Sequence, residues 1–218
     1  MAKSVKVFAW IISALSHPLL VLTYGLILIV AFNPYVFGVT EVKDELPLIL
    51  ICLAYTFFLP FISIIFMKLV GLVKSFHLDT NEERIGPLII CIVFYTWFYI
   101  NIYRNAEIPI LVGVFSFGSV IALSIAFFIT VFTKISLHMV AWGGISALMI
   151  NMLWHFGYQT LSIGQWEVHI RLVLIFLILI SGLVASSRMA LNVHKPKDIF
   201  GGFLVGFTAQ LIAIKFLL

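Results

Sequence analysis

Seven long apolar runs dominate the chain, with short polar segments between them. The runs cover residues 7–33, 47–73, 86–103, 109–133, 139–158, 167–186 and 198–218. A helix needs about 20 apolar residues to cross the hydrocarbon core of a bilayer, and each run is long enough to do so. Prolines and charges separate several runs, as between Asp79 and Pro87. The pattern predicts an all-α fold, a polytopic membrane helical bundle with about seven (six to seven) transmembrane helices.

The composition of the chain agrees with this pattern. Apolar residues make up 63% of the chain and charged residues 10%, whereas soluble domains have about 45–50% and 25%. These values exclude a soluble enzyme, a nucleic-acid-binding protein and a disordered chain. The net charge of +4 then reflects lipid headgroups and membrane orientation. We expect one integral membrane domain over residues 1–218, in contact with the lipid bilayer, and a bacterial cytoplasmic membrane is the first candidate location.

Several residues within the runs predict local features. The first run is too long for the core of a signal peptide, so we expect a retained helix. Pro18 and Pro60 predict kinks, and His17 is expected to hydrogen-bond a neighbouring helix. Cys52 and Cys91 lie in apolar runs, so they predict neither a disulfide nor a zinc site. Close contacts between helices are expected at the glycines Gly143, Gly144, Gly201, Gly202 and Gly206.

The ionisable residues gather in three of the connections between runs. These connections follow the second, fourth and sixth runs, and because two crossings separate each from the next, all three lie on one membrane face. Their ionisable residues are Lys74, His77, Asp79, Glu82, Glu83, Arg84, Lys134, His138, Arg188, His194, Lys195, Lys197 and Asp198. The opposite face carries mostly carboxylates. Because charge at membrane depth is costly and usually functional, this face predicts a site for an anion.

The last of these connections has the clearest arrangement. Arg188 ends the sixth run, and Pro196 is suited to the first position of the last helix, which leaves His194 just before that helix. Helix N-termini and arginine side chains both bind phosphoryl oxygens. Asp198 is four residues after His194, within reach of one ring nitrogen, so the other nitrogen would be a nucleophile. The alternative is that Arg188 is an interfacial charge, His194 a turn residue and Asp198 only a complement to the helix dipole.

The spacing Ser-Arg-x5-His-x3-Asp resembles the third signature of the type 2 phosphatidic acid phosphatase superfamily, which also includes vanadium-dependent haloperoxidases. Its fixed positions are matched by Ser187, Arg188, His194 and Asp198. The membrane composition argues against a haloperoxidase.

The second signature of this superfamily, Pro-Ser-Gly-His, is similar to residues 135–138. Ser136 and His138 are kept, while isoleucine and leucine replace the proline and the glycine. The alternative is that Ser136 only caps the next helix and that His138 is an interfacial residue of its first turn.

The first signature, Lys-x6-Arg-Pro, is matched at Arg84 alone. His77 stands where the lysine is expected, and Pro87 comes two residues late. Lys74, one turn earlier, is the other candidate for the positive charge. The alternative is a solvated charged loop. The resemblance extends over roughly residues 74–210.

The resemblance implies a phosphatase that hydrolyses a lipid or polyprenyl phosphate or diphosphate through a phosphohistidine, without a metal or other cofactor. His194 would be the nucleophile, Asp198 would orient it, and His138 would serve as acid and base. The phosphate-binding residues would be Arg188, Arg84, Ser136 and either Lys74 or His77. Two alternatives remain open: a lipid phosphotransferase, and a non-catalytic transporter or scaffold with a decayed site.

Membrane orientation is not decided by the charges. Nine of the 13 Lys and Arg residues lie on the face of the three connections, which by the positive-inside rule would be cytoplasmic. Many members of the superfamily work on the outer or lumenal face. Because the site itself accounts for several of these charges, the sequence leaves the orientation open, and it does not predict an oligomeric state.

Overall fold

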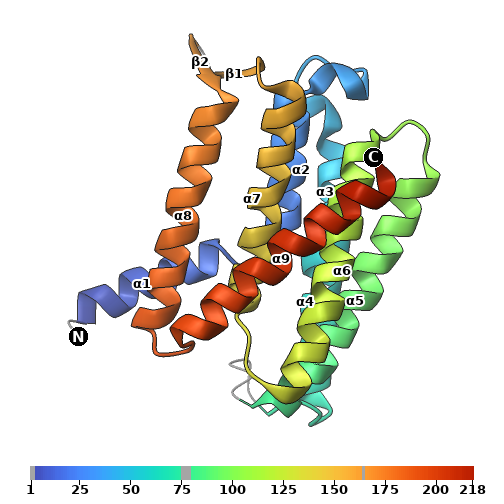
Figure 1. Cartoon of the computed structure of the whole chain (residues 1–218). Helices are drawn as coiled ribbons and strands as arrows, with labels where there is room; N and C mark the ends of the chain where they lie inside the picture. The colour runs from blue at the N-terminus through green and yellow to red at the C-terminus, as the bar shows by residue number, and fades with distance from the viewer. Residues whose placement is uncertain (1–2, 75–79, 164) are drawn as a thin grey trace.

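The apolar runs form helices in a computed structural model, which describes residues 3–74, 80–163 and 165–218 (Figure 1). The helices are α1 (Lys3–Leu15), α2 (Pro18–Phe32), α3 (Leu46–Leu53), α4 (Leu59–Leu69), α5 (Asn81–Arg104), α6 (Ile110–Phe132), α7 (Leu137–Phe156), α8 (Ile170–Ala190) and α9 (Pro196–Leu217). Two 3-10 helices, Pro34–Phe37 and Val42–Glu45, follow α2, and a π-helical turn, Ala54–Phe58, joins α3 to α4. A short antiparallel hairpin, β1 (Thr160–Ile163) and β2 (Trp166–His169), precedes α8.

The lengths of the helices suit a membrane. Within the described ranges, six helical segments are long and apolar enough to cross a bilayer, or up to seven when the bent pair α1 and α2 counts as one span. Large apolar side chains are exposed along the helices, among them Phe128, Trp154 and Phe176. Exposure of so many large apolar side chains would be unfavourable in water, whereas it is expected for helices that face lipid. The predicted all-α membrane bundle is confirmed, and the hairpin is the element that the apolar pattern did not predict.

The first apolar run is not one straight helix. The axes of α1 and α2 differ by 58° across the break at His17. The cause is Pro18, which cannot continue the hydrogen bonding of α1 and which forces the preceding residue out of the helical region. His17 accordingly has φ −57° and ψ 132°. As a result α1 extends to the left past the lower part of α8 in Figure 1 and packs against that helix.

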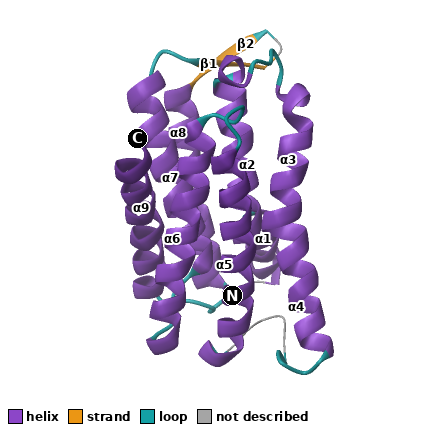
Figure 2. Cartoon of the chain, turned by 90° about the vertical axis from the view of Figure 1, so that its right-hand side faces the viewer, coloured by secondary structure: helices purple, strands orange, loops and turns teal. Residues whose placement is uncertain are grey.

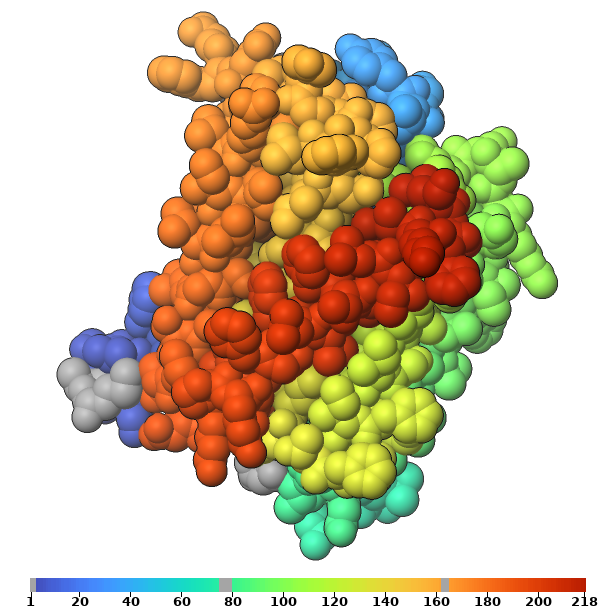
Figure 3. Space-filling model, in the orientation of Figure 1, coloured from blue at the N-terminus to red at the C-terminus, as the bar shows by residue number. Residues whose placement is uncertain are grey.

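The three polar connections come to the same end of the bundle. In Figures 1 and 2 the start of α5, the α6–α7 connection and the α8–α9 connection lie at the lower end, and α1 lies beside them. The hairpin and the connections after α2 and α5 lie at the upper end. The last helix, α9, crosses the face of the molecule diagonally, against α7 and α6 (Figure 3). The chain topology therefore gathers the predicted site residues at one end.

Glycines allow α7 and α9 to approach closely. A methyl group at Gly206 would overlap the Val140 carbonyl oxygen, and one at Gly202 would lie 2.6 Å from the Ser136 carbonyl oxygen. These contacts confirm the predicted role of the two glycines and hold the start of α9 against the start of α7. The same prediction was wrong for Gly201, because a methyl group there would meet nothing within 4 Å.

The two glycines of α9 provide a matched test of this packing. Gly206→Ala should lower the free energy of unfolding by about 1–3 kcal/mol, the usual cost of overpacking. Gly201→Ala should leave it unchanged or raise it by about 0.5–1 kcal/mol, because alanine favours the helix. Thermal unfolding of both variants in the same detergent measures the difference. Equal stability of the two variants would contradict the close contact at Gly206.

Candidate functional site

The connection between α8 and α9 places three of the predicted site residues together. Arg188 lies in the last turn of α8, and His194 follows in the connection. Asp198 lies in the first turn of α9, where its Oδ2 accepts a hydrogen bond from the Lys195 amide at 3.0 Å. The same oxygen is 3.7 Å from Nδ1 of His194, and both side chains are buried. One carboxylate therefore caps α9 and also faces the imidazole.

The start of α7 is joined to this connection. The Ser136 amide donates a hydrogen bond to the Asp198 carbonyl oxygen at 3.1 Å. Ser136 stands at the N-cap position of α7, but its hydroxyl makes no capping hydrogen bond. His138, two residues later, is buried as well, so neither side chain lies at the exposed interface.

Arg84 extends the group from a third element. It lies in the first turn of α5, and only 7% of its surface is exposed. Its positive charge acts on both Arg188 and His194, which places the three side chains within electrostatic range. The start of α5 thus faces the α8–α9 connection.

The two candidates for the positive charge of the first signature were Lys74 and His77, and the structure shows a further lysine near the site. Lys74 is exposed after α4, and His77 lies outside the described residues. Lys134, in the α6–α7 connection, is half-buried, and its charge acts on His194. The sequence placed Lys134 on the correct face but not in the site, because it occupies no position of the three signatures.

The break between α1 and α2 adds two residues that sequence reasoning did not assign to the site. The buried Ser13 accepts a hydrogen bond from Arg188 Nη1 through its hydroxyl. Its carbonyl oxygen lies 3.0 Å from Nε2 of His138. The ring of His17 lies edge to face against that of His138, with 5.7 Å between the centroids. The signal in the sequence was that Ser13 and His17 are polar, four residues apart, and next to Pro18 within an apolar run.

The contact with Ser13 fixes the tautomer of His138. A carbonyl oxygen can only accept a hydrogen bond, so Nε2 of His138 must carry the proton that it donates to Ser13. The other ring nitrogen, Nδ1, is then the atom that can take up or release a second proton. His138 is therefore oriented by the backbone at the end of α1.

The environment of His194 keeps its imidazole neutral. Burial, followed by the positive charges of Arg188 and Arg84, lowers the pKa of His194 to about 4, while the Asp198 carboxylate acts in the opposite direction. At neutral pH the ring therefore retains an unprotonated nitrogen. A neutral imidazole beside two arginines can act as a nucleophile toward an anion that the arginines hold.

Several buried polar atoms at this site have no hydrogen-bond partner in the described part of the chain. They are Ser136 Oγ, Arg188 Nε and His194 Nδ1. Buried polar groups are nearly always paired, so an unpaired group in a native structure requires an explanation. A hydroxyl and a guanidinium nitrogen that can still donate, next to a second arginine, suit the oxygens of a bound anion.

The fold and the site together define an all-α membrane-spanning protein with a buried, positively charged polar site at one end of the bundle. Among the residues that the structure describes, no group of three or more His, Cys, Asp or Glu side chains could hold a metal ion. Comparisons with models of protein families, with curated proteins and with solved structures found no match to this chain.

Proposed function

We propose that this protein is a metal-independent phosphatase that hydrolyses a lipid or polyprenyl phosphate or diphosphate through a phosphohistidine intermediate. The observation that carries the proposal is a pair of buried donors, Ser136 Oγ and Arg188 Nε, which have no partner among the described residues and lie at the same site as the buried imidazoles of His138 and His194. The resemblance of three segments to the type 2 phosphatidic acid phosphatase superfamily also supports it.

The first step transfers the phosphoryl group to the protein. Arg84, Arg188 and Ser136 hold the phosphoryl oxygens, where negative charge is spread in the transition state. Nε2 of His194 attacks phosphorus in line with the leaving oxygen, while Asp198 stabilises the proton on Nδ1. The bond from phosphorus to the leaving oxygen breaks, and His138, which begins this step with both ring nitrogens protonated, gives that oxygen its Nδ1 proton and becomes neutral.

The second step returns the enzyme to its starting state. A water molecule attacks the phosphohistidine, and Nδ1 of His138 takes a proton from it. The bond between phosphorus and His194 Nε2 breaks, and inorganic phosphate leaves. His194 is then again neutral, in keeping with its low pKa of about 4.

The position of the site supports a lipid substrate. The site lies at the ends of helices whose outer surfaces carry large exposed apolar side chains. A molecule with its apolar part in the hydrocarbon and its phosphate at the interface would bring the phosphate to this depth. A water-soluble phosphate ester would not need a site of this kind.

The purified full-length chain in detergent tests the proposal. We expect phosphate release from at least one of a panel of lipid phosphates and diphosphates in the presence of a metal chelator. We also expect inhibition by vanadate, which can adopt the geometry of the phosphoryl transition state. Loss of activity on chelation would contradict the metal-independent mechanism. Transfer of the phosphoryl group to a second lipid without free phosphate would instead identify a phosphotransferase, and inactivity toward the whole panel would favour a non-catalytic protein.

A further inference from the structure

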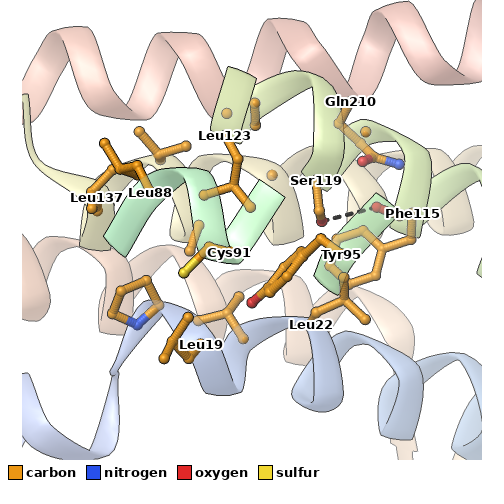
Figure 4. A pocket seen from close by; sticks show the side chains of 18 residues that line it. Leu19, Leu22, Leu88, Cys91, Tyr95, Phe115, Ser119, Leu123, Leu137 and Gln210 are labelled. Atoms are coloured by element: carbon orange, nitrogen blue, oxygen red, sulfur yellow. Dashed lines mark hydrogen bonds between the residues drawn. The ribbon is translucent and has the colours of Figure 1, made fainter. Parts of the chain in front are cut away.

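An apolar cavity lies inside the bundle, directly beyond the candidate site. It is enclosed by residues of α2, α5, α6, α7 and α9. In Figure 4, Leu88 and Leu137 lie at one end, Cys91 lies midway, and Phe115 and Gln210 lie at the other end. None of the described residues that line the cavity is charged. A cavity with such a lining accepts apolar ligands.

Two polar side chains in the cavity wall, Ser119 and Gln210, form hydrogen bonds with backbone carbonyl oxygens. The Ser119 hydroxyl donates to the Phe115 carbonyl oxygen of its own helix at 3.0 Å. The Gln210 amide reaches the Val114 carbonyl oxygen at 3.5 Å. A ligand in the cavity would therefore be held by apolar contacts and needs no polar group of its own at this depth.

One end of the cavity adjoins the site residues. Its lining includes Pro18, which follows His17, and Leu137, which precedes His138. On α5, the site residue Arg84 is followed on the same helix face by three cavity residues at helical spacing. This buried stripe consists of Arg84, Leu88, Cys91 and Tyr95. The charged site and the apolar cavity therefore lie one after the other along the same face of α5.

The size of the cavity limits what can occupy it. From Leu88 to Tyr95 the cavity extends along α5 for about 10 Å, at roughly 1.5 Å per residue. The cavity has a volume of about 70 Å³. Pockets that hold a whole ligand of drug size are larger, at roughly 300–1,000 Å³. This space suits part of one apolar chain and not the paired chains of a diacyl lipid.

We propose that the cavity binds the first segment of a single long apolar chain whose phosphate ester lies among Arg84, Arg188 and His194. The substrate class is then a phosphate or diphosphate of a single-chain alcohol, alkyl or isoprenoid. This inference rests on the proposed phosphatase function for the role of the phosphate, but the cavity itself is independent of that chemistry. The chain beyond the cavity continues into the bilayer.

A cavity-filling variant tests the inference through the dependence of activity on chain length. Ser119→Leu places extra volume in the inner half of the cavity and removes only a hydrogen bond within α6. For long alkyl phosphates we expect kcat/KM to fall about tenfold, since roughly two methylene groups lose their buried position. For butyl phosphate we expect no change. Ser124→Leu is the matched control, because Ser124 bonds its own helix in the same way and does not line the cavity.

The outcomes separate the two proposals. An unchanged dependence on chain length in Ser119→Leu, or faster turnover of diacyl phosphates than of single-chain phosphates, would overturn the cavity assignment and leave the phosphatase intact. A long-chain alkyl phosphate with a photoreactive group about 10 Å along its chain provides a second measurement that needs no turnover. Labelling of Tyr95 or Phe115 supports the assignment even in an inactive protein. Labelling confined to lipid-facing residues such as Phe128 contradicts it.

Discussion

His194→Ala should reduce phosphate release by about 10⁴-fold or more, to the level of the reaction without protein. The substitution removes the nucleophile, and no other described imidazole at the site has the same setting. Nε2 of His138 is already hydrogen-bonded to the Ser13 carbonyl oxygen. The variant should still fold, since Nδ1 of His194 has no hydrogen-bond partner in the described part of the chain and only approaches Asp198 Oδ2 at 3.7 Å. Rates are measured with the lipid phosphate that the wild-type protein hydrolyses fastest.

A trapped intermediate makes this test specific for the nucleophile. Acid-labile labelling of the protein by a radioactive lipid phosphate should be present in wild type and absent in His194→Ala. His155→Ala is the control, because His155 is an exposed histidine at the other end of α7 and should retain full activity. If His194→Ala kept wild-type turnover, or if it were labelled as strongly as wild type, the phosphohistidine mechanism would be wrong.

Much of the fold could be predicted because lipid imposes a simple rule on sequence. Each spanning helix needs a long apolar run, so the runs located the helices, and the alternation of crossings placed three connections on one face. Pro18 could be predicted to kink the first run because its effect is local. The direction that α1 takes after the break depends on its packing against α8, and no local pattern contains that information.

The candidate site shows the same division between local and distant information. Arg188, His194 and Asp198 could be grouped because they are close in sequence on one helix–helix connection. Ser13 could not be added to them, because 125 residues separate it from His138 and only the packed bundle brings the two together. The cavity could not be predicted from the sequence either. Every run is apolar, so residues that line a cavity cannot be distinguished by type from residues that fill the core.

Arg188→Lys should lower kcat/KM by about 10²–10³-fold although it keeps the positive charge. The guanidinium presents several donors in a fixed plane, and one of them, Nη1, already bonds Ser13 while Nε is buried without a partner among the described residues. A lysine ammonium can place a charge near the phosphate but cannot bond Ser13 and a phosphoryl oxygen in this fixed geometry. The loss should appear as weaker inhibition by vanadate as well as slower turnover.

Arg171→Lys is the matched control for Arg188→Lys, because Arg171 lies in the first turn of the same helix and is exposed. We expect it to keep wild-type turnover and vanadate inhibition. If Arg188→Lys also kept both, the guanidinium would serve only to tie α8 to Ser13. The donor Nε would then need another explanation, and the anion site would have to be built on Arg84 and Ser136. A fall in thermal stability with unchanged vanadate inhibition would lead to the same conclusion, because a purely structural bond would affect unfolding and not anion binding.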